Sequence, residues 1–310
     1  MKATLAPVAL FVFNRPEHLR RTIESLRLCE GFADSPVIVF ADGIRNTVDS
    51  SAVDATRRVA IELLGDKAEY RLAEINQGLG NSIISGVGQL LEQYGRVIVV
   101  EDDLVLSPCF LRFMNDGLEH YSNDSRVYQI SGHMFDVREF GQRREALLLP
   151  LTTTWGWATW DRAWKAFDPN ATGWEKLLRD HSMRKRFNLG GVYDYTHMLE
   201  RQMSGKRQSW GVRWYWSVFA RGGLTCFPPQ SLVANIGMDG TGTHGCGKLR
   251  TFERITLTQS PLKFVAPPGE MPELPAFVAL RRAIWHQNGK WLGLIVDLLR
   301  RAHWALSWRS

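Results

Sequence analysis

Three acidic residues in a row, Glu101, Asp102 and Asp103, follow a run of four β-favouring residues at 97–100. Adjacent carboxylates at the end of a buried strand repel one another, which raises their pKa values unless a cation neutralises them. Mg²⁺ and Mn²⁺ prefer carboxylate oxygens and often share them with substrate phosphates. This acidic triplet therefore predicts a divalent-metal site, with a solvated acidic turn as the plainer alternative.

Further polar residues stand where other predicted strands end. Asn14 and Asp42 each follow a continuous apolar run, and Asn76 follows a weaker strand signal. Ligands of parallel α/β sheets bind outside the carboxyl ends of the strands. We therefore expect these three side chains and the acidic triplet to line one shared site.

Strand and helix signals alternate over the first third of the chain. The strand signals are continuous rather than alternating, which is typical of a parallel sheet covered by helices on both faces. The sequence therefore predicts an α/β fold class with a mainly parallel central sheet. The predicted strands cover 8–13, 37–41, 71–74 and 97–100, and the predicted helices cover 16–27, 53–64 and 81–94.

The composition excludes a disordered or fibrous protein, because 45% of the 310 residues are hydrophobic and 23% are charged. The net charge of +6 suits anionic ligands, an anionic membrane surface or nucleic acid, but no nucleic-acid motif accompanies it, so no nucleic-acid partner is predicted. The scattered cysteines form no C-x-x-C pair, which disfavours zinc and redox motifs. Neither a signal-peptide pattern nor an apolar run of about 18 residues occurs, which predicts a cytoplasmic protein.

Several segments resemble one enzyme family in their order along residues 8–247. One segment of this chain resembles the metal-site segment of GT-A glycosyltransferases. It reads VIVVEDDLVLSPCFLRFMNDGLEHYSNDSRVYQISG. The similarity is to eukaryotic N-acetylglucosaminyltransferase I and to bacterial family 2-type sugar transferases of surface-polysaccharide pathways. Three earlier segments match the family in the same order: FVFNRPEHLRRTIESL, VIVFADG and NQGLGNSI. Three later segments resemble the acceptor half of the bacterial group: TTTWGWATWDRAW, SWGVRWYWSVFARGGLTCFPPQSLVANIG and MDGTGTHG.

This resemblance implies a GT-A fold and a metal-dependent transfer reaction, while the residues at the end of the chain predict a C-terminal helical tail. A hexosyl or N-acetylhexosaminyl unit would move from a nucleotide-diphosphate sugar, with a UDP-sugar favoured, to a glycan or lipid-linked saccharide. The product would belong to surface polysaccharide, such as lipopolysaccharide or capsule. The implied cofactor is Mn²⁺ or Mg²⁺.

The resemblance also implies roles for the strand-end residues. Asp103 would bind the metal that bridges the two donor phosphates, Glu101 would face the ribose, and Asp102 would face the transferred sugar or the metal's water shell. The remaining donor-site residues would contact the base or diphosphate or shape the nucleotide pocket, where glycines allow close backbone approach. They are Asn14, Arg15, Asp42, Asn76, Gly78 and Gly80.

The catalytic base is where the chain departs from the family pattern. Many relatives carry an aspartate where this sequence has Gly211. An inverting transferase needs a carboxylate that takes the acceptor hydroxyl's proton. We expect Asp239 in that role, with Asp194 and Asp161 as alternatives. His244, in the same glycine-rich loop as Asp239, is expected to complete the metal site.

The acceptor side is predicted from aromatic residues, because 12 tryptophans are clustered in two parts of the chain. Most are expected to be core, but Trp155 and Trp157 flank a glycine and are predicted to contact a sugar. Arg213 is predicted to bind an anionic acceptor or the diphosphate, with a structural ion pair as the alternative. His133 is a weaker candidate near the acceptor.

The expected organisation is a transferase domain at 1–246, a proline-rich linker at 247–275 and a basic C-terminal tail at 276–310. The domain would divide into a nucleotide-binding half at 1–105 and an acceptor half at 106–246. In the tail, apolar and cationic residues interleave, which suits either the interface of an anionic membrane or packing on the body. Peripheral attachment to the inner face of the cytoplasmic membrane is therefore a further expectation.

Two other functions stay open at this point. A sugar-phosphate nucleotidyltransferase uses a related sheet but needs a glycine-rich, basic loop after the first strand, and the segment NRP is a poor match. A pseudoenzyme that binds a glycan or a nucleotide-sugar is favoured by Gly211 at the usual base position. Hydrolysis of a nucleotide-sugar would separate a transferase from a pseudoenzyme.

Overall fold

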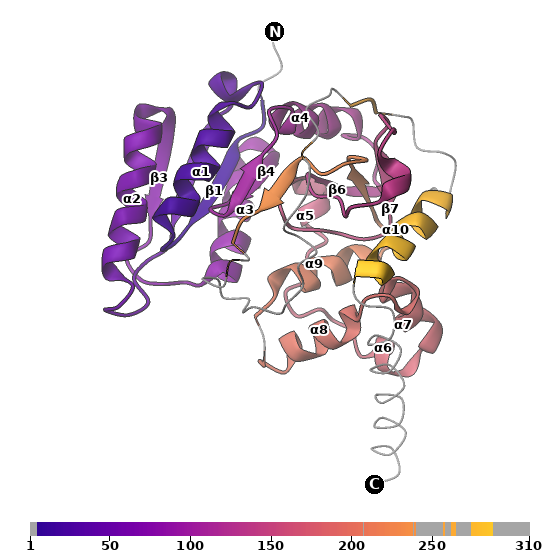
Figure 1. The fold of residues 1–310 in the computed structure, drawn as a ribbon. Helices are drawn as coiled ribbons and strands as arrows, with labels where there is room; N and C mark the ends of the chain where they lie inside the picture. The colour runs from indigo at the N-terminus through magenta and orange to yellow at the C-terminus, as the bar shows by residue number, and fades with distance from the viewer. Residues whose placement is uncertain are drawn as a thin grey trace.

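The computed structural model describes residues 5–206, 208–237, 239, 257, 262–264 and 274–287. An eight-stranded sheet runs through the centre of the molecule in the order β3-β2-β1-β4-β8-β6-β9-β7, with helices packed around it (Figure 1). Four of these strands come from the first third of the chain, and the other four come from residues 127–227.

The first four strands are all parallel. β1 (Val8–Val12) pairs with both β2 (Val37–Ala41) and β4 (Arg96–Glu101), and β3 (Ala68–Leu72) forms the outer edge beside β2. Every residue of β1 is buried, as expected for a central strand. The mainly parallel α/β sheet predicted from the sequence is therefore confirmed, although β3 begins earlier than predicted.

Three helices connect these strands: α1 (Pro16–Arg27), α2 (Ser50–Leu64) and α3 (Leu79–Tyr94). The chain moves outward from β1 to β3 and then returns to β4. Right-handed crossovers therefore place α1 and α2 on one face and α3 on the other. α1 packs along α2, and α3 packs on β1 and β4.

The second half of the sheet is mixed. β8 (Trp157–Trp160) lies antiparallel between β4 and β6 (Val127–Ser131), which is parallel to β9 (Leu224–Phe227). β7 (Leu147–Leu149) closes the far edge antiparallel to β9. α4 (Phe110–His120) covers β6 and β8.

A separate two-stranded ribbon joins distant parts of the chain beside the acidic triplet. β5 (Leu104–Leu106) follows the triplet directly and pairs antiparallel with β10 (Val233–Asn235). This pairing brings residues 235–237 back over the turn that carries Asp102 and Asp103.

A second apolar cluster lies beyond the sheet and is built largely by short helices. Its C-terminal member, α10, buries Ala276, Leu280 and Ile284 in it. The helices around this cluster and β8 are α5 (Asp161–Trp164), α6 (Lys176–Arg179), α7 (His181–Phe187), α8 (Tyr195–Met203), α9 (Trp210–Phe219) and α10 (Leu274–Gln287).

The described parts of the predicted linker and tail pack on the body. Lys263 forms a parallel bridge with Glu145, and the Phe264 ring stacks on Phe113 with centroids 5.0 Å apart. α10 begins at Leu274, within the predicted linker, and packs on the second apolar cluster. Residues 291–309, to which the membrane prediction applied, lie outside the described residues. No helix in the described part of the chain is long and apolar enough to cross a bilayer.

Candidate functional site

The ends of β1, β2 and β4 meet at one edge of the sheet. Phe11 in β1 lies opposite Phe40 in β2 on one side and Glu101 in β4 on the other. Strands are about 5 Å apart, so the ends of β2 and β4 are separated by about 10 Å. The strand order therefore brings Asn14, Asp42 and the acidic triplet to the same edge, as the sequence predicts.

The acidic triplet is held in the sheet and in the turn after it. Asp102 is 9% exposed, and its Oδ2 accepts a hydrogen bond of 3.0 Å from the backbone N–H of Phe13. The Thr22 hydroxyl donates to the backbone carbonyl of Asp102 at 2.9 Å. These contacts fix the β4–β5 turn to the end of β1 and to α1.

Burial makes the charged forms of all three carboxylates costly. It raises the pKa of Asp102 to about 7, with the charge of Asp103 as the next cause. It also raises the pKa of Glu101 well above its usual value, and repulsion from Asp103 and Asp102 adds to this shift. The pKa of Asp103 is raised by burial but pulled down by Arg15. The site therefore favours an added positive charge.

Arg15 supplies one positive charge to this cluster. Its Nη1 lies 2.9 Å from Oδ2 of Asp103, and both side chains are 16% exposed. Arg15 stands immediately before α1, which begins with Pro16. The end of β1 thereby places a cation against the β4–β5 turn.

Gly237 closes over this ion pair. The backbone N–H of Ile236 donates to the carbonyl oxygen of Asp103 at 2.8 Å. A Cβ atom on Gly237 would lie 2.1 Å from Asp103 Oδ2 and 2.6 Å from Arg15 Nη1. A side chain at this position would have to displace the Asp103 carboxylate and the Arg15 guanidinium, so the glycine allows the ion pair to form as it does.

His18 joins Asp239 to the same cluster. Its Nε2 lies 3.1 Å from Asp239 Oδ2 and 3.2 Å from the carbonyl oxygen of Ile236. His18 is not among the site residues predicted from the sequence. Its spacing of three residues from Arg15, along the start of α1, is the signal that could have found it. His244, the predicted metal ligand, lies outside the described residues.

Asp42 organises the loop that precedes α3. Its carboxylate accepts hydrogen bonds from the backbone N–H groups of Gly43, Gln77 and Gly78 at 2.8, 2.8 and 3.0 Å, and from Asn76 Nδ2 at 2.9 Å. The structure therefore brings Asp42, Asn76 and Gly78 together, and the carboxylate shapes the loop through these bonds. Gly78 has a φ of 77°, the left-handed region in which glycine is favoured.

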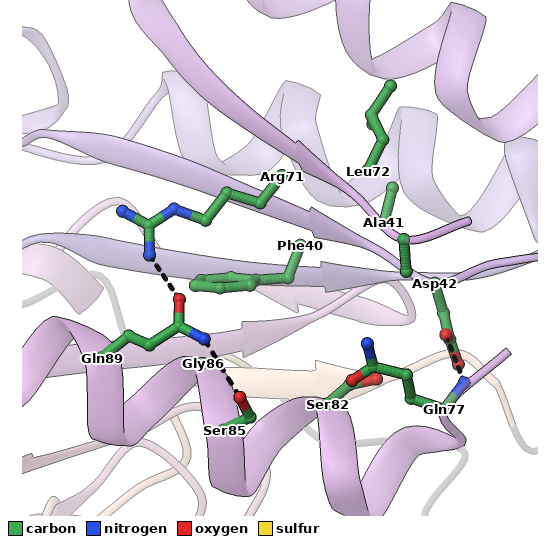
Figure 2. A pocket seen from close by; sticks show the side chains of 11 residues that line it. Phe40, Ala41, Asp42, Arg71, Leu72, Gln77, Ser82, Ser85, Gly86 and Gln89 are labelled. Carbon is green, nitrogen blue, oxygen red and sulfur yellow. Dashed lines mark hydrogen bonds between the residues drawn. The ribbon is translucent and has the colours of Figure 1, made fainter. Parts of the chain in front are cut away.

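A pocket of about 200 Å³ extends from Asp42 along α3 (Figure 2). Phe40 forms one wall, and the Arg71 guanidinium lies 5.3 Å from the centre of its ring. Arg71 Nη1 also donates to Gln89 Oε1 at 2.9 Å. A Cβ on Gly86 would lie 2.9 Å from Phe40, so the glycine allows α3 to approach the sheet here. This volume is below the roughly 300–1,000 Å³ that is typical of small-molecule sites.

Trp157 does not line a cleft. It is completely buried in β8, and its ring centroid lies 5.4 Å from that of Trp210 and 5.8 Å from that of Trp164. The prediction that Trp157 contacts an acceptor is therefore wrong, because neither face of its ring is available. Trp155 is half-buried, and its ring meets that of His133 edge-on at 4.6 Å.

Arg213, on α9, reaches toward the donor half. Its Nη1 donates to the carbonyl oxygen of Pro169 at 3.1 Å, and its Nη2 lies 3.9 Å from where a Cβ on Gly80 would stand. Burial lowers the pKa of Arg213. The start of α3 and the acceptor half are therefore neighbours at this point.

The candidate bases have different surroundings. Asp194 caps α8 by accepting from the His197 N–H at 3.0 Å, and Asp161, the first residue of α5, pairs at 2.6 Å with Lys165, which follows the helix. Asp239 is 44% exposed, and its partner His18 also contacts the carbonyl oxygen of Ile236, in the loop that lies over Asp103. The position of Gly211 faces Thr154, whose Cγ2 would lie 3.0 Å from an added Cβ.

The residues present fit a divalent cation that is shared with phosphates. Within residues 5–206 and the other described segments, no group of three or more His, Cys, Asp and Glu side chains forms a ready-made metal cage. Mg²⁺ typically needs only one or two carboxylates when substrate phosphates supply further ligands. Asp103, backed by two buried carboxylates, matches that pattern.

Comparison with known proteins identifies distant structural neighbours. No protein-family model matches the chain. The galactosyltransferase LgtC, in complex with donor and acceptor sugar analogs, matches with 11% identity and a TM-score of 0.38 over 71% of this chain and 72% of LgtC. Glycosyltransferases are thus among the solved structures that the chain resembles. An active-site mutant of LgtC matches with 12% identity and a TM-score of 0.38 over 81% of this chain and 84% of LgtC.

S. aureus TarS shares 16% identity at a TM-score of 0.27, over 40% of this chain and 21% of TarS. At such low identities and TM-scores the likeness assigns no function.

Proposed function

We propose that the chain is a glycosyltransferase that moves a sugar from a nucleotide-diphosphate sugar to a glycan or lipid-linked saccharide. The observation that carries this proposal is the Arg15–Asp103 ion pair of 2.9 Å at the carboxyl edge of the sheet. At that edge, where parallel sheets bind nucleotides, a positively charged side chain lies beside a carboxylate that can bind a metal. Asp42 and its loop border the same edge.

The donor would lie across the ends of β1, β2 and β4. The Asn76–Gly78 loop, held by Asp42, would shape the nucleotide pocket. Arg15 would contact the diphosphate, since a guanidinium matches phosphate oxygens in geometry and charge. Glu101 and Asp102 would face the ribose and the transferred sugar, and a UDP-sugar is the favoured donor.

A divalent cation suits this arrangement. When bound, Mn²⁺ or Mg²⁺ would stabilise the negative charge that develops on the leaving diphosphate. Asp103 would hold it, with His244 as the further ligand that the family resemblance suggests. Glu101 and Asp102, both disfavoured as free anions by burial, would be stabilised by the same charge.

Asp239 is the proposed base. Its carboxylate is partly exposed, so it can meet an acceptor hydroxyl, and His18 holds it beside the loop that covers Asp103. A carboxylate in that position can take the hydroxyl's proton as the oxygen attacks the sugar. Trp155 and Arg213 would contribute to the acceptor side. The transferred unit would be a hexosyl or N-acetylhexosaminyl group of a surface polysaccharide.

The test is a panel of UDP-, GDP-, dTDP- and CMP-sugars, measured by thermal shift with and without Mn²⁺ and then by release of free nucleotide. We expect one nucleoside-diphosphate sugar to raise the melting temperature in a Mn²⁺-dependent way and to be hydrolysed slowly. The matched variant Asp103→Asn should lose both effects. If no nucleotide-sugar stabilises the chain, the proposal is wrong; binding without release would favour the pseudoenzyme, in line with Gly211.

A further inference from the structure

The Arg15–Asp103 pair occupies the carboxylate that the proposed function needs for a metal. Arg15 Nη1 contacts Asp103 Oδ2 at 2.9 Å, and only 16% of either side chain is exposed. The buried Glu101 and Asp102 lie on one side, and His18 with Asp239 lies on the other. Arg15 therefore supplies the positive charge that pairs with Asp103 within this acidic cluster.

The backbone at 235–237 holds this arrangement closed on one side. Asn235 Oδ1 accepts from the Gly237 N–H at 2.8 Å, and Ile236 bonds to the carbonyl oxygen of Asp103 at 2.8 Å. Gly237 approaches so closely that an added Cβ would overlap Asp103 Oδ2. The ion pair thus has little room to shift as a unit.

A guanidinium and a divalent cation cannot share this carboxylate at low cost. Mg²⁺ binds carboxylate oxygens at about 2.0–2.1 Å, so the two positive charges would stand within a few ångströms of each other in a largely buried site, where repulsion is poorly screened. Binding of the cation therefore requires Arg15 to leave Asp103. Arg15 then needs another anion, because an unpaired, buried charge is costly.

We infer that Arg15 and the divalent cation compete for Asp103, so that the cation binds together with a nucleoside diphosphate rather than before it. This inference rests on the proposed function for the diphosphate, which offers phosphate oxygens to the displaced guanidinium. Arg15 is in this sense a positioning residue that couples the two ligands.

The coupling is reciprocal. A nucleoside diphosphate that draws Arg15 away raises the affinity for the cation, and the cation raises the affinity for the nucleoside diphosphate by the same factor. Removing the charge at Arg15 should uncouple them in a specific direction. The cation alone should bind more tightly, and the added effect of the nucleoside diphosphate should shrink.

The experiment measures Mn²⁺ affinity of the full chain, from the electron paramagnetic resonance signal of free Mn²⁺, with and without UDP. Arg15→Gln is compared with the wild type and with the control Arg20→Gln, which removes a different α1 ion pair, to Glu62 at 3.2 Å. For Mn²⁺ alone we expect about tenfold tighter binding in Arg15→Gln, corresponding to about 1.4 kcal/mol, and no change in the control.

Unchanged or weaker Mn²⁺ binding by Arg15→Gln without UDP overturns the inference, and so does a UDP effect that is present and equally large in this variant and the wild type. If UDP affects neither protein, the uridine donor favoured in the proposed function is wrong, while the comparison with Mn²⁺ alone still decides the competition. Far-UV circular dichroism checks folding. Should Arg15→Gln fail to fold, Arg15→Lys is read by the same criteria, with a smaller gain expected because lysine keeps the charge.

Discussion

The side-chain amide of Asn76 donates to Oδ2 of Asp42 at 2.9 Å and to the carbonyl oxygen of Gly43 at 3.0 Å. One asparagine thereby ties the end of β2 to the loop that starts α3. Together with the backbone N–H groups that Asp42 also accepts, the contact makes this carboxylate a structural centre of the candidate donor site. Its substitution should affect both the fold and nucleotide binding.

Asp42→Asn should lower the free energy of unfolding by about 2 kcal/mol, because an amide has only one acceptor oxygen and leaves buried N–H groups unpaired. Urea denaturation measures this change. Asp54→Asn, at an exposed position of α2, is the matched control and should have no effect. Equal stability of Asp42→Asn and the wild type would show that the loop does not depend on the carboxylate.

Gly237→Ala should disrupt the Arg15–Asp103 pair, since the new methyl group would start 2.1 Å from Asp103 Oδ2. We expect at least a tenfold loss of nucleotide-sugar hydrolysis, measured by nucleotide release. Gly88→Ala is the control, because its added Cβ would meet no atom within 4 Å. That change should leave hydrolysis intact and raise stability by about 0.5–1 kcal/mol, as expected in a helix interior. Full activity of Gly237→Ala would contradict the packing described here.

Removal of divalent cations should abolish turnover of the nucleotide-sugar. Excess EDTA is expected to reduce nucleotide release to background, and Mn²⁺ added beyond the chelator should restore it, because the leaving diphosphate loses its main stabilising charge. Asp103→Asn should not be restored by Mn²⁺, whereas the exposed Asp116→Asn should respond like the wild type. Undiminished turnover in EDTA would exclude the metal-dependent reaction.

The stability of the fold should depend on His133 below neutral pH. Burial lowers the pKa of His133 to about 3, while an unfolded histidine titrates near 6.5. The stabilisation from its neutral form is thus fully present above about pH 6.5 and is lost as pH falls toward 3, at up to about 1.4 kcal/mol per pH unit.

His133→Asn tests this sign. From pH 7.5 to 4.5 the variant should lose less unfolding free energy than the wild type, as measured by urea denaturation at each pH. Both proteins keep the acidic triplet, so the difference between them isolates the imidazole. His181→Asn, at an exposed position, should follow the wild-type profile. Parallel profiles for His133→Asn and the wild type would show that the imidazole becomes charged without cost.

The parallel half of the fold could be predicted because its central strands are continuous apolar runs that are buried on both faces. β3 was misplaced for the opposite reason: Glu69 and Arg71 lie on an edge strand and carry no such pattern. The position of β8 between β4 and β6 depends on pairings between distant segments, which no local pattern records.

In the candidate site, too, some features follow from local sequence patterns and others depend on how distant segments fold together. The rule that polar residues follow parallel strands predicted that Asn14, Asp42 and the acidic triplet share an edge. It could not show that backbone N–H groups would engage Asp42, because that depends on how the following loop folds back. Trp157 was misjudged because its neighbour Gly156 signals a close approach but does not show that β8 lies inside the sheet with both of its sides buried.

The antiparallel pairing of β8 with β4 also bears on the order in which the chain can fold during synthesis. Residues 97–99 pair with 157–159, so one side of β4 presents unpaired backbone groups until that later segment leaves the ribosome. At about 5–20 residues per second this interval lasts several seconds. An open, apolar strand edge is a template for association with other chains. The nascent protein should therefore be most prone to aggregation, and most dependent on chaperones, before β8 is made.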